Sequence, residues 1–301
     1  MADFDWGDVR FFLAVARCGT LTAAAQRLGT DHTTVGRRVK TLEVALKAKL
    51  FERLTSGYSL TPQGTRFLGA LESMESAAIA AEESIKEADL SLSGRVRIGA
   101  TDGFGTFFLA PRLGRLQQIH PDLELNLLAM PRVFSLSRRE ADLAIGLRQP
   151  VEGRLFARKL TDYELGVYGS TIYLERHPPI RDIAELQDHP FISYIDDFMY
   201  AEELDYLPRV SPLIRSRLKI SNPIAQMQAT LSGYGLCVMP CFMADPTPGL
   251  RRVLQAEVAL QNSFWLIMHA DQRRLARVRA VADHIQEIVQ VERKLFFAAA
   301  G

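Results

Sequence analysis

The sequence has little cysteine and no long apolar run, and both absences narrow the kinds of protein that it encodes. Three cysteines among 301 residues cannot build the disulfide framework of a secreted domain, and they favour a reducing compartment. No apolar stretch reaches the length of a membrane-spanning helix. The first residues, MADFDWGDVR, lack the basic start and apolar stretch of a signal peptide. We therefore expect a cytoplasmic protein with no membrane partner.

Motifs for catalysis, cofactor binding and metal binding are missing as well. The six histidines are scattered without metal-ligand spacing. GATDGFG at residues 99–105 lacks both G-x-G-x-x-G and a Walker lysine. The apolar sequence around Cys237 and Cys241 favours two buried small residues over a redox switch. No nucleophile has an evident base partner, so we expect no enzyme activity, no cofactor and no metal.

What the chain does have is an uneven distribution of charge. Its formal net charge is only +1, and 48% hydrophobic residues over 301 positions suit a globular protein of two domains. Between residues 10 and 66, however, ten basic side chains stand against three acidic ones. Such a segment is typical of phosphate contact, although a merely solvated face is the alternative.

Apolar spacing in this basic segment predicts three short helices. Val9, Phe12, Leu13 and Ala16 share one face of the first, which ends at Gly19. Thr20 or Thr22 can cap a second helix, whose inner face is Ala24, Ala25 and Leu28 and which ends at Gly29. Asp31 can cap a third, with Val35, Val39, Leu42 and Leu46 inward. Two helices joined by a tight glycine turn, the second of them basic outside, indicate a helix-turn-helix.

The outward face of the third helix is the candidate reading surface for DNA. Arginine can donate two hydrogen bonds to guanine, and threonine can contact a thymine methyl group or a phosphate. Gly36 either lets the helix backbone approach DNA or is a tolerated small residue, and His32 either reads a base or caps the helix. Residues 50–54 and 58–61 predict a hairpin, the wing, with Arg53 at its base near phosphate or the minor groove. The predicted DNA-binding residues are His32, Thr33, Thr34, Gly36, Arg37, Arg38, Lys40 and Arg53.

A long amphipathic helix follows from residue 63. Its apolar residues alternate in steps of four and three, which suits pairing with a second helix; packing on its own domain is the alternative. The predicted dimerisation residues are Phe67, Leu71, Met74, Ala78, Ala81 and Ile85, and Ala88 continues the pattern.

Beyond residue 94 strand and helix patterns alternate. Strands are predicted at GRVRIGAT, LELNLLAM, ADLAIGL, ELGVYGS, PFISYI, GYGLCVMP and SFWLIMHA, and helices at residues 103–119, 223–231 and 273–291. This order indicates an α/β domain with a mainly parallel sheet.

Several motifs together resemble the LysR-type transcriptional regulators. In residues 11–64 the shared marks are AxxL at 25–28, VxRxVKxLE at 35–43, LFER at 50–53 and LTPQG at 60–64. GRVRIGAT, READLAIGL, FARKLTDYELGVYGSTIYLERHPPI and LSGYGLCVMPCFMA extend the likeness through the remainder. DHTTVGRR stands where the family usually has SQPAVSRQ, so the base preference is expected to differ while the scaffold is kept.

The resemblance implies a multidomain α+β architecture. We expect a winged helix-turn-helix at 1–62, a dimerising linker helix at 63–90, a hinge at 91–94 and an effector-binding domain at 95–301. The last would be a two-lobed fold of the type 2 periplasmic-binding-protein kind, with lobe 1 near 95–160 and 269–301 and lobe 2 near 161–268. In the family the linker helices pair antiparallel, and DNA contacts fall at the start of the third helix and on the wing, here His32, Thr33, Gly36, Arg37 and Arg53.

Such a fold binds its ligand between the lobes, at the carboxyl ends of strands and the amino ends of helices. The candidate effector-binding residues are Thr101, Asp102, Met130, Gly146, Arg148, Tyr194, Asp196 and Asp197; plain loop structure is the alternative for each. Many family members bind small carboxylates, whereas Asp102, Asp196 and Asp197 would oppose an anion unless a base such as Arg148 offsets them. We therefore expect a neutral, hydroxyl-rich or cationic effector, or none.

The function that follows is sequence-specific regulation of transcription, modulated by a small-molecule effector. The expected partners are double-stranded DNA, the effector and further copies of the chain in a homodimer or homotetramer, with RNA polymerase left open. The alternative function is that of a small-solute-binding protein without a gene-regulatory role.

Overall fold

In the computed structural model, residues 4–86, 92–134, 136, 140–150, 155–270 and 272–298 are described. The chain divides into two compact units, which we call the N-terminal unit (Met1–Leu90 with Ser137–Glu140) and the C-terminal unit (Ser91–Leu136 with Ala141–Gly301). Within the described part of the chain, none of the helices combines the length and the apolar character needed to cross a bilayer.

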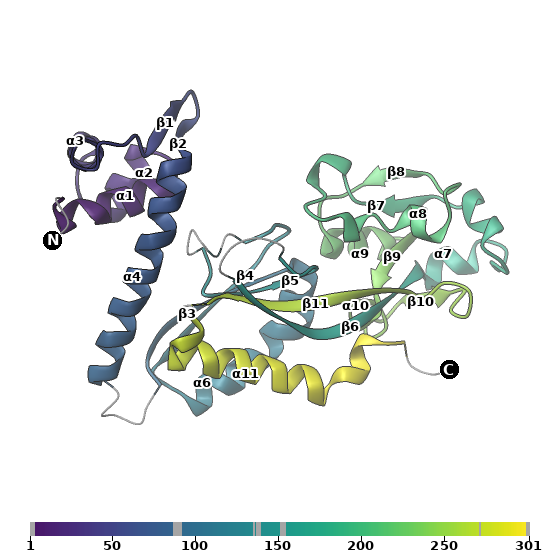
Figure 1. The fold of residues 1–301 in the computed structure, drawn as a ribbon. Helices are drawn as coiled ribbons and strands as arrows, with labels where there is room; N and C mark the ends of the chain where they lie inside the picture. Colours follow the sequence, from purple (N-terminus) through teal and green to yellow (C-terminus); the bar gives the residue numbers. More distant parts are fainter. Residues whose placement is uncertain are drawn as a thin grey trace. The chain divides into compact units, whose positions relative to one another are not determined.

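The N-terminal unit is three helices, a two-stranded wing and a long helix (Figure 1). Its elements are α1 Trp6–Cys18, α2 Leu21–Leu28, α3 His32–Ala45, β1 Phe51–Leu54, β2 Gly57–Leu60 and α4 Pro62–Lys86. Thr20 caps α2, accepting a hydrogen bond from the Ala23 N–H at 3.2 Å, and Asp31 caps α3. Gly19 and Gly29 end α1 and α2 with φ of 72° and 64°, a conformation that glycine adopts without strain. The predicted winged helix-turn-helix is confirmed.

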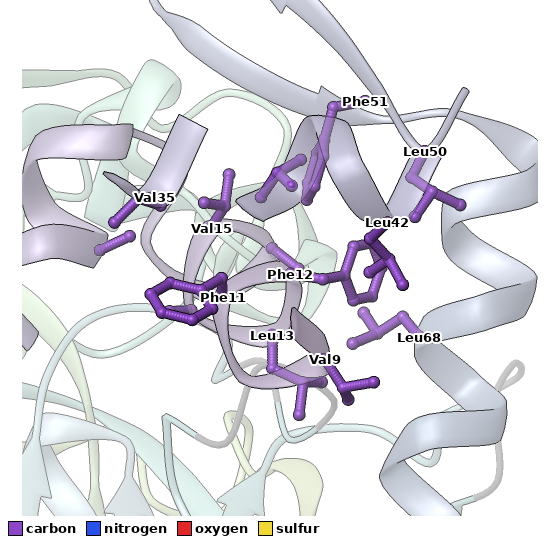
Figure 2. Packing of buried hydrophobic residues seen from close by; sticks show 14 of the residues in the cluster. Val9, Phe11, Phe12, Leu13, Val15, Val35, Leu42, Leu50, Phe51 and Leu68 are labelled. Carbon is purple, nitrogen blue, oxygen red and sulfur yellow. The ribbon is translucent and has the colours of Figure 1, made fainter. Parts of the chain in front are cut away.

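The core of this unit joins all of its helices. The side chains of Phe12, Val35 and Leu42 are fully buried, and Figure 2 shows Phe12 of α1 pointing toward Leu42 of α3 and Leu68 of α4. The small residues Ala24 and Ala25 are buried on α2, as close helix packing requires.

The first turns of α4 correct the predicted dimerisation seam. Leu71 is only 3% exposed, and the Phe67 ring lies 5.1 Å from the Phe12 ring, so both side chains belong to the core of their own unit. The alternative of packing on the parent domain therefore holds for this end of α4. Met74 and Ala78 are exposed, whereas the side chains of Ala81 and Ile85, and Ala88 itself, lie outside the described residues.

The C-terminal unit is built on one long mixed sheet. Its strands follow the order β4-β3-β5-β11-β6-β9-β7-β8, with β10 also paired to β6. They are β3 Gly94–Ala100, β4 Leu123–Ala129, β5 Leu143–Gly146, β6 Leu155–Ser170, β7 Phe191–Ser193, β8 Ser216–Lys219, β9 Leu236–Pro240, β10 Leu250–Val253 and β11 Leu260–His269. The two ends of the sheet are parallel, but β6 pairs antiparallel with β9, β10 and β11, and β11 pairs antiparallel with β5. The prediction of a mainly parallel sheet is therefore wrong at its centre.

Strands β6 and β11 run through both halves of this sheet (Figure 1). The predicted lobe boundaries at 160/161 and 268/269 thus fall inside continuous strands. The register of the β11–β6 pairing shifts between Phe264, which faces Thr161, and Trp265, which faces Lys159. Leu160 of β6 is therefore an extra residue. Such a bulge bends a paired ribbon locally.

Helical segments complete the unit. The predicted helix at 103–119 is realised as α5 Asp102–Phe104, a π-helical stretch η1 Gly105–Leu109 and α6 Ala110–Ile119. The Arg112 guanidinium of α6 pairs with the Glu292 carboxylate at 2.5 Å, just beyond α11 Ala276–Val291. The other helical segments are α7 Thr171–Glu175, η2 Ala184–Asp188, η3 Asp196–Phe198, η4 Glu202–Leu204, α8 Leu207–Val210, α9 Pro223–Leu231, α10 Cys241–Ala244, η5 Gln272–Arg274 and η6 Arg293–Phe296.

Candidate DNA-binding surface and effector cleft

Helix α3 separates its side chains as its sequence predicts. Val35, Val39 and Leu42 are buried against the core. His32, Thr33, Arg37, Lys40 and Thr41 are exposed on the opposite side. These side chains carry base-reading donors, a methyl group and a phosphate-binding ammonium, so the exposed face has the chemistry for a major-groove contact. That they touch DNA remains a prediction.

Asp31 organises the first turn of α3. Its Oδ1 accepts hydrogen bonds from the Thr34 N–H at 2.7 Å and from the Thr33 hydroxyl, and its Oδ2 accepts from the Thr34 hydroxyl at 2.7 Å. These bonds favour the ionised carboxylate and hold the pKa of Asp31 well below its ordinary value. Because both threonine hydroxyl protons are engaged, Thr33 and Thr34 have methyl groups and oxygen lone pairs left for any outside contact.

Arg38, whose predicted DNA contact stays a prediction, binds its own domain. Its guanidinium donates to the Asp8 carboxylate of α1 at 3.1 Å, and Asp8 is only 1% exposed. The guanidinium carbon also lies 5.9 Å from the centre of the Phe11 ring. A buried carboxylate requires this charge, so Arg38 is a residue that positions α3 on α1.

Gly36 has a packing role that neither predicted explanation included. A Cβ atom added at this position would lie 3.3 Å from Cδ1 of Leu21 on α2. An alanine here would therefore require the Leu21 side chain to shift by a few tenths of an ångström.

The wing is held to the helices at both of its ends. Oε1 of Glu43 accepts hydrogen bonds from the backbone N–H groups of Leu50 at 2.7 Å and Phe51 at 3.2 Å. Gly57, with φ of 138°, packs so closely on α1 that an added Cβ would lie 2.3 Å from the Gly19 carbonyl oxygen. Arg53 on β1 is exposed. The glutamate of VxRxVKxLE was visible in the sequence, but its role in holding β1 depends on this non-local contact.

The predicted effector residues lie on three different cavities. Thr101, Asp102 and Tyr194 line a central chamber of about 30 Å³. Gly146 and Arg148 line a lobe-1 cavity of about 410 Å³, which Thr101 also borders. Asp196 lines a lobe-2 cavity of about 400 Å³, which Tyr194 also borders. The other two predicted residues, Met130 and Asp197, line none of these three cavities.

The central chamber is a carboxylate among aromatic side chains. Asp102 is 6% exposed; its Oδ1 accepts from the Gly103 N–H at 3.1 Å, and its buried Oδ2 has no hydrogen-bond partner among the described residues. Burial raises the pKa of Asp102 above its ordinary value. Four tyrosines and three phenylalanines share the lining, namely Tyr163, Tyr194, Tyr200, Tyr206, Phe104, Phe242 and Phe264.

Sequence reasoning found Tyr194 but missed the other aromatic residues of the chamber. Tyr163 comes from β6 and Phe264 from β11, and their rings stack 4.2 Å apart. Nothing local in either strand marks them, because only the antiparallel pairing brings these strands together. Burial raises the pKa of Tyr163 to about 12, so its hydroxyl stays protonated at neutral pH.

The other acids near the cleft differ from Asp102. Asp196 is exposed, and its carboxylate pairs with the Lys219 ammonium at 2.6 Å. Asp197 is exposed as well. Of the three aspartates expected to oppose an anion, Asp102 is therefore the one that lines the central chamber.

Two of the three cysteines, Cys237 and Cys241, are buried in the C-terminal unit. Cys237 and Cys241 are 1% and 0% exposed, and burial raises the pKa of their thiols to about 12 and about 11. The prediction of buried small residues is confirmed, and such thiols are poor nucleophiles. Across the described residues, no three His, Cys, Asp or Glu side chains gather in a way that could hold a metal ion.

Comparison with known proteins shows to which family the two parts of the chain are similar. Residues 6–65 match the family described as "Bacterial regulatory helix-turn-helix protein, lysR family", and residues 90–290, more than half of the chain, match "LysR substrate binding domain". An HTH-type transcriptional regulator of Xanthomonas campestris is 27% identical over 290 residues, covering 93% of this chain and 84% of the relative. The Mau operon transcriptional activator of Paracoccus denitrificans is 26% identical over 263 residues, covering 87% and 89%.

A solved structure supports the fold over nearly the whole chain. The crystal structure of ArgP from Mycobacterium tuberculosis superposes with a TM-score of 0.69 at 18% identity, over 95% of this chain and 97% of that one. At this identity the likeness concerns architecture alone.

Proposed function

The chain belongs to the LysR family of bacterial transcriptional regulators, and on this premise we propose that α3 and the wing bind operator DNA under the control of a ligand held in the C-terminal unit. The regulatory function and the effector-binding domain come with the family. What we add is the assignment of both roles to particular residues of this chain.

One observation carries the assignment of the reading surface. The outward face of α3 presents His32, Thr33, Arg37 and Lys40 to solvent, while the helix itself is fixed by Asp31 and by the Arg38–Asp8 pair. Exposed base-reading side chains on a rigidly held helix are what direct readout in the major groove requires. Arg53 on the wing supplies a further phosphate or minor-groove contact.

A binding assay tests this assignment. Fluorescence anisotropy with DNA from upstream of the protein's own gene, against a scrambled duplex, should show specific binding that Arg37→Ala weakens by about tenfold or more. Arg176→Ala removes an exposed arginine from the C-terminal unit and serves as the matched control, with affinity unchanged. Weak, salt-sensitive binding of equal strength to both duplexes would contradict the assignment.

We further propose that chains pair through the part of α4 beyond Leu71. Met74 and Ala78 are exposed there, whereas Phe67 and Leu71 are occupied in their own core. A dimer presents two reading helices to two half-sites, which raises operator affinity without new contacts to bases. A contact with RNA polymerase and a location in the cytoplasm remain predictions.

We infer that the ligand controls DNA binding at the β6–β11 bulge, where we expect the two lobes to join. Phe264 lines the central chamber and faces Thr161, the neighbour of the extra residue Leu160 in β6. A ligand in the chamber touches both lobes beside this joint and so favours one lobe angle over another. In an oligomer, a change in the angle between the lobes alters the spacing of the winged helix-turn-helix domains.

A further inference from the structure

We propose that the effector is a primary ammonium ion with an apolar body, whose charged head binds Asp102 in the central chamber. The inference rests on the proposed function and narrows the class of ligand that this cleft takes. It also separates this chain from family members that bind small carboxylates at the same position.

The first step is the charge state of the chamber. Asp102 is only 6% exposed, and Oδ2 is enclosed without a hydrogen-bond partner among the described residues. None of the residues that line the chamber is a lysine, arginine or histidine. A buried carboxylate without a countercharge is costly, and a cationic ligand supplies both the missing charge and the missing donor.

The second step is the chemistry of the walls. Tyr163 and Phe264 stack at 4.2 Å, and Phe104 lies 4.5 Å from Phe264, so the chamber has an aromatic lining on both strands of the lobe joint. Aromatic faces attract cations and repel anions, because the ring quadrupole is negative above its plane. Thr101 and the tyrosines lining the chamber carry hydroxyl oxygens that can accept the remaining N–H groups of an ammonium.

The third step is size. A chamber of about 30 Å³ has room for a head of the size of an ammonium group. The lobe-1 cavity of about 410 Å³ adjoins it, sharing Thr101, Leu147 and Tyr200. Its other walls are mostly apolar, including Phe134, Ile145 and Ile267. A volume of this size is ordinary for a small-ligand pocket, so the body of the ligand lies there.

Two arginines, Arg132 and Arg148, border the lobe-1 cavity, and neither prevents it from holding the apolar body of the ligand. Arg132 lies over the Phe134 ring at 4.9 Å, and Arg148 is exposed to solvent. The lobe-2 cavity is the less suitable site for the body, because Asp196, Asp205, Arg215 and Lys219 line it.

Four small probes test the inference on the full-length protein. Titration calorimetry and thermal shift would compare 2-phenylethylammonium with 2-phenylethanol and 3-phenylpropionate, and n-hexylammonium would replace the ring by an alkyl chain. We expect at least one ammonium probe to bind about tenfold or more tightly than the alcohol, and the carboxylate not to bind. Equal or tighter binding of the carboxylate, or no binding of either ammonium at millimolar concentration, would overturn the inference.

Two matched variants locate the head group. Asp102→Asn keeps an oxygen for the Gly103 N–H but loses the charge, and it should lower ammonium affinity about tenfold or more while leaving the alcohol unaffected. Asp196→Asn neutralises an exposed aspartate of the lobe-2 cavity and should leave ammonium affinity unchanged. An Asp102→Asn protein that binds the ammonium as the parent does would refute the assignment.

The two proposals fail in different ways. Specific operator binding by the ligand-free protein, lost in Arg37→Ala, supports the reading surface whatever the probes do. If the probes fail while operator binding persists, only the ligand class is wrong. If operator binding fails while the ammonium binds through Asp102, the proposed reading surface is wrong instead.

Discussion

Asp31 and Asp102 both stand at the start of a helix, but the two units of the chain use them differently. Asp31 is exposed and accepts three hydrogen bonds from the first turn of α3, which depress its pKa. Asp102 is buried and leaves Oδ2 without a partner among the described residues, and burial raises its pKa. In the N-terminal unit acidic groups serve the fold, and the same holds for Asp8 with Arg38 and for Glu43 with the wing. In the cleft a carboxylate remains available to a ligand.

The largest change in stability should come from removing the Arg38 side chain that pairs with Asp8. Arg38→Ala leaves a buried carboxylate without its charge partner and is expected to lower the free energy of unfolding of the N-terminal unit by about 2 kcal/mol. The two tryptophans are Trp6 on α1 and Trp265 on β11. In a Trp265→Phe background, urea unfolding followed by fluorescence therefore reports on the N-terminal unit.

Arg37→Ala is the matched control for that experiment. Arg37 is exposed, so its removal should change stability by less than about 0.5 kcal/mol while weakening operator binding. If Arg38→Ala unfolds like the parent and loses operator affinity as Arg37→Ala does, then Arg38 reads DNA and its assigned positioning role is wrong.

A smaller change in stability, a gain instead of a loss, is expected when Asp102 is replaced by asparagine. Its folded-state pKa is raised, so ionising it costs folding free energy; this cost is absent below the ordinary value of 3.8 and complete above the raised pKa. Asp102→Asn should therefore stabilise the ligand-free protein by about 1 kcal/mol at neutral pH. Thermal unfolding across pH should show this gain shrinking on acidification. A destabilised variant at neutral pH would mean that Asp102 is satisfied in the free protein.

The smallest effect is expected at Asp31. Asparagine also caps helices well, so Asp31→Asn should change stability little at neutral pH. Because the folded-state pKa of Asp31 is depressed, its extra stabilisation is present above 3.8 and is lost as the pH falls through the folded-state value. The parent's advantage over Asp31→Asn should thus vanish in acid, opposite in trend to Asp102→Asn. An advantage that grew on acidification would contradict the observed hydrogen bonds.

The sequence predicted the N-terminal unit well because its signals are local. Helical spacing placed Val35, Val39 and Leu42 inside, and Asp31 and Gly29 marked helix ends at the residues observed. The contacts that the sequence did not reveal are those whose partner lies far along the chain. Arg38 pairs with Asp8, thirty positions earlier in the chain. Phe67 packs on α1, and helical spacing alone could not distinguish this contact from a contact in a dimer.

The C-terminal unit was predicted in its elements but less well in their pairing. Strand patterns identify β6 and β11 without indicating that they pair antiparallel through both lobes. In the cleft, too, the sequence does not reveal residues that only the tertiary fold brings together. Thr101, Asp102 and Tyr194 were found because they follow strands, whereas Tyr163 and Phe264 lie within strands and reach the chamber only through the tertiary fold.

One measurement links the two regions most directly. It is the affinity of the full-length protein for its own upstream DNA, relative to a scrambled duplex, with and without the ammonium probe that binds. We predict specific binding that the probe changes in the parent protein and leaves unchanged in Asp102→Asn. Equal affinity for both duplexes, or the same response to the probe in Asp102→Asn, would contradict the account.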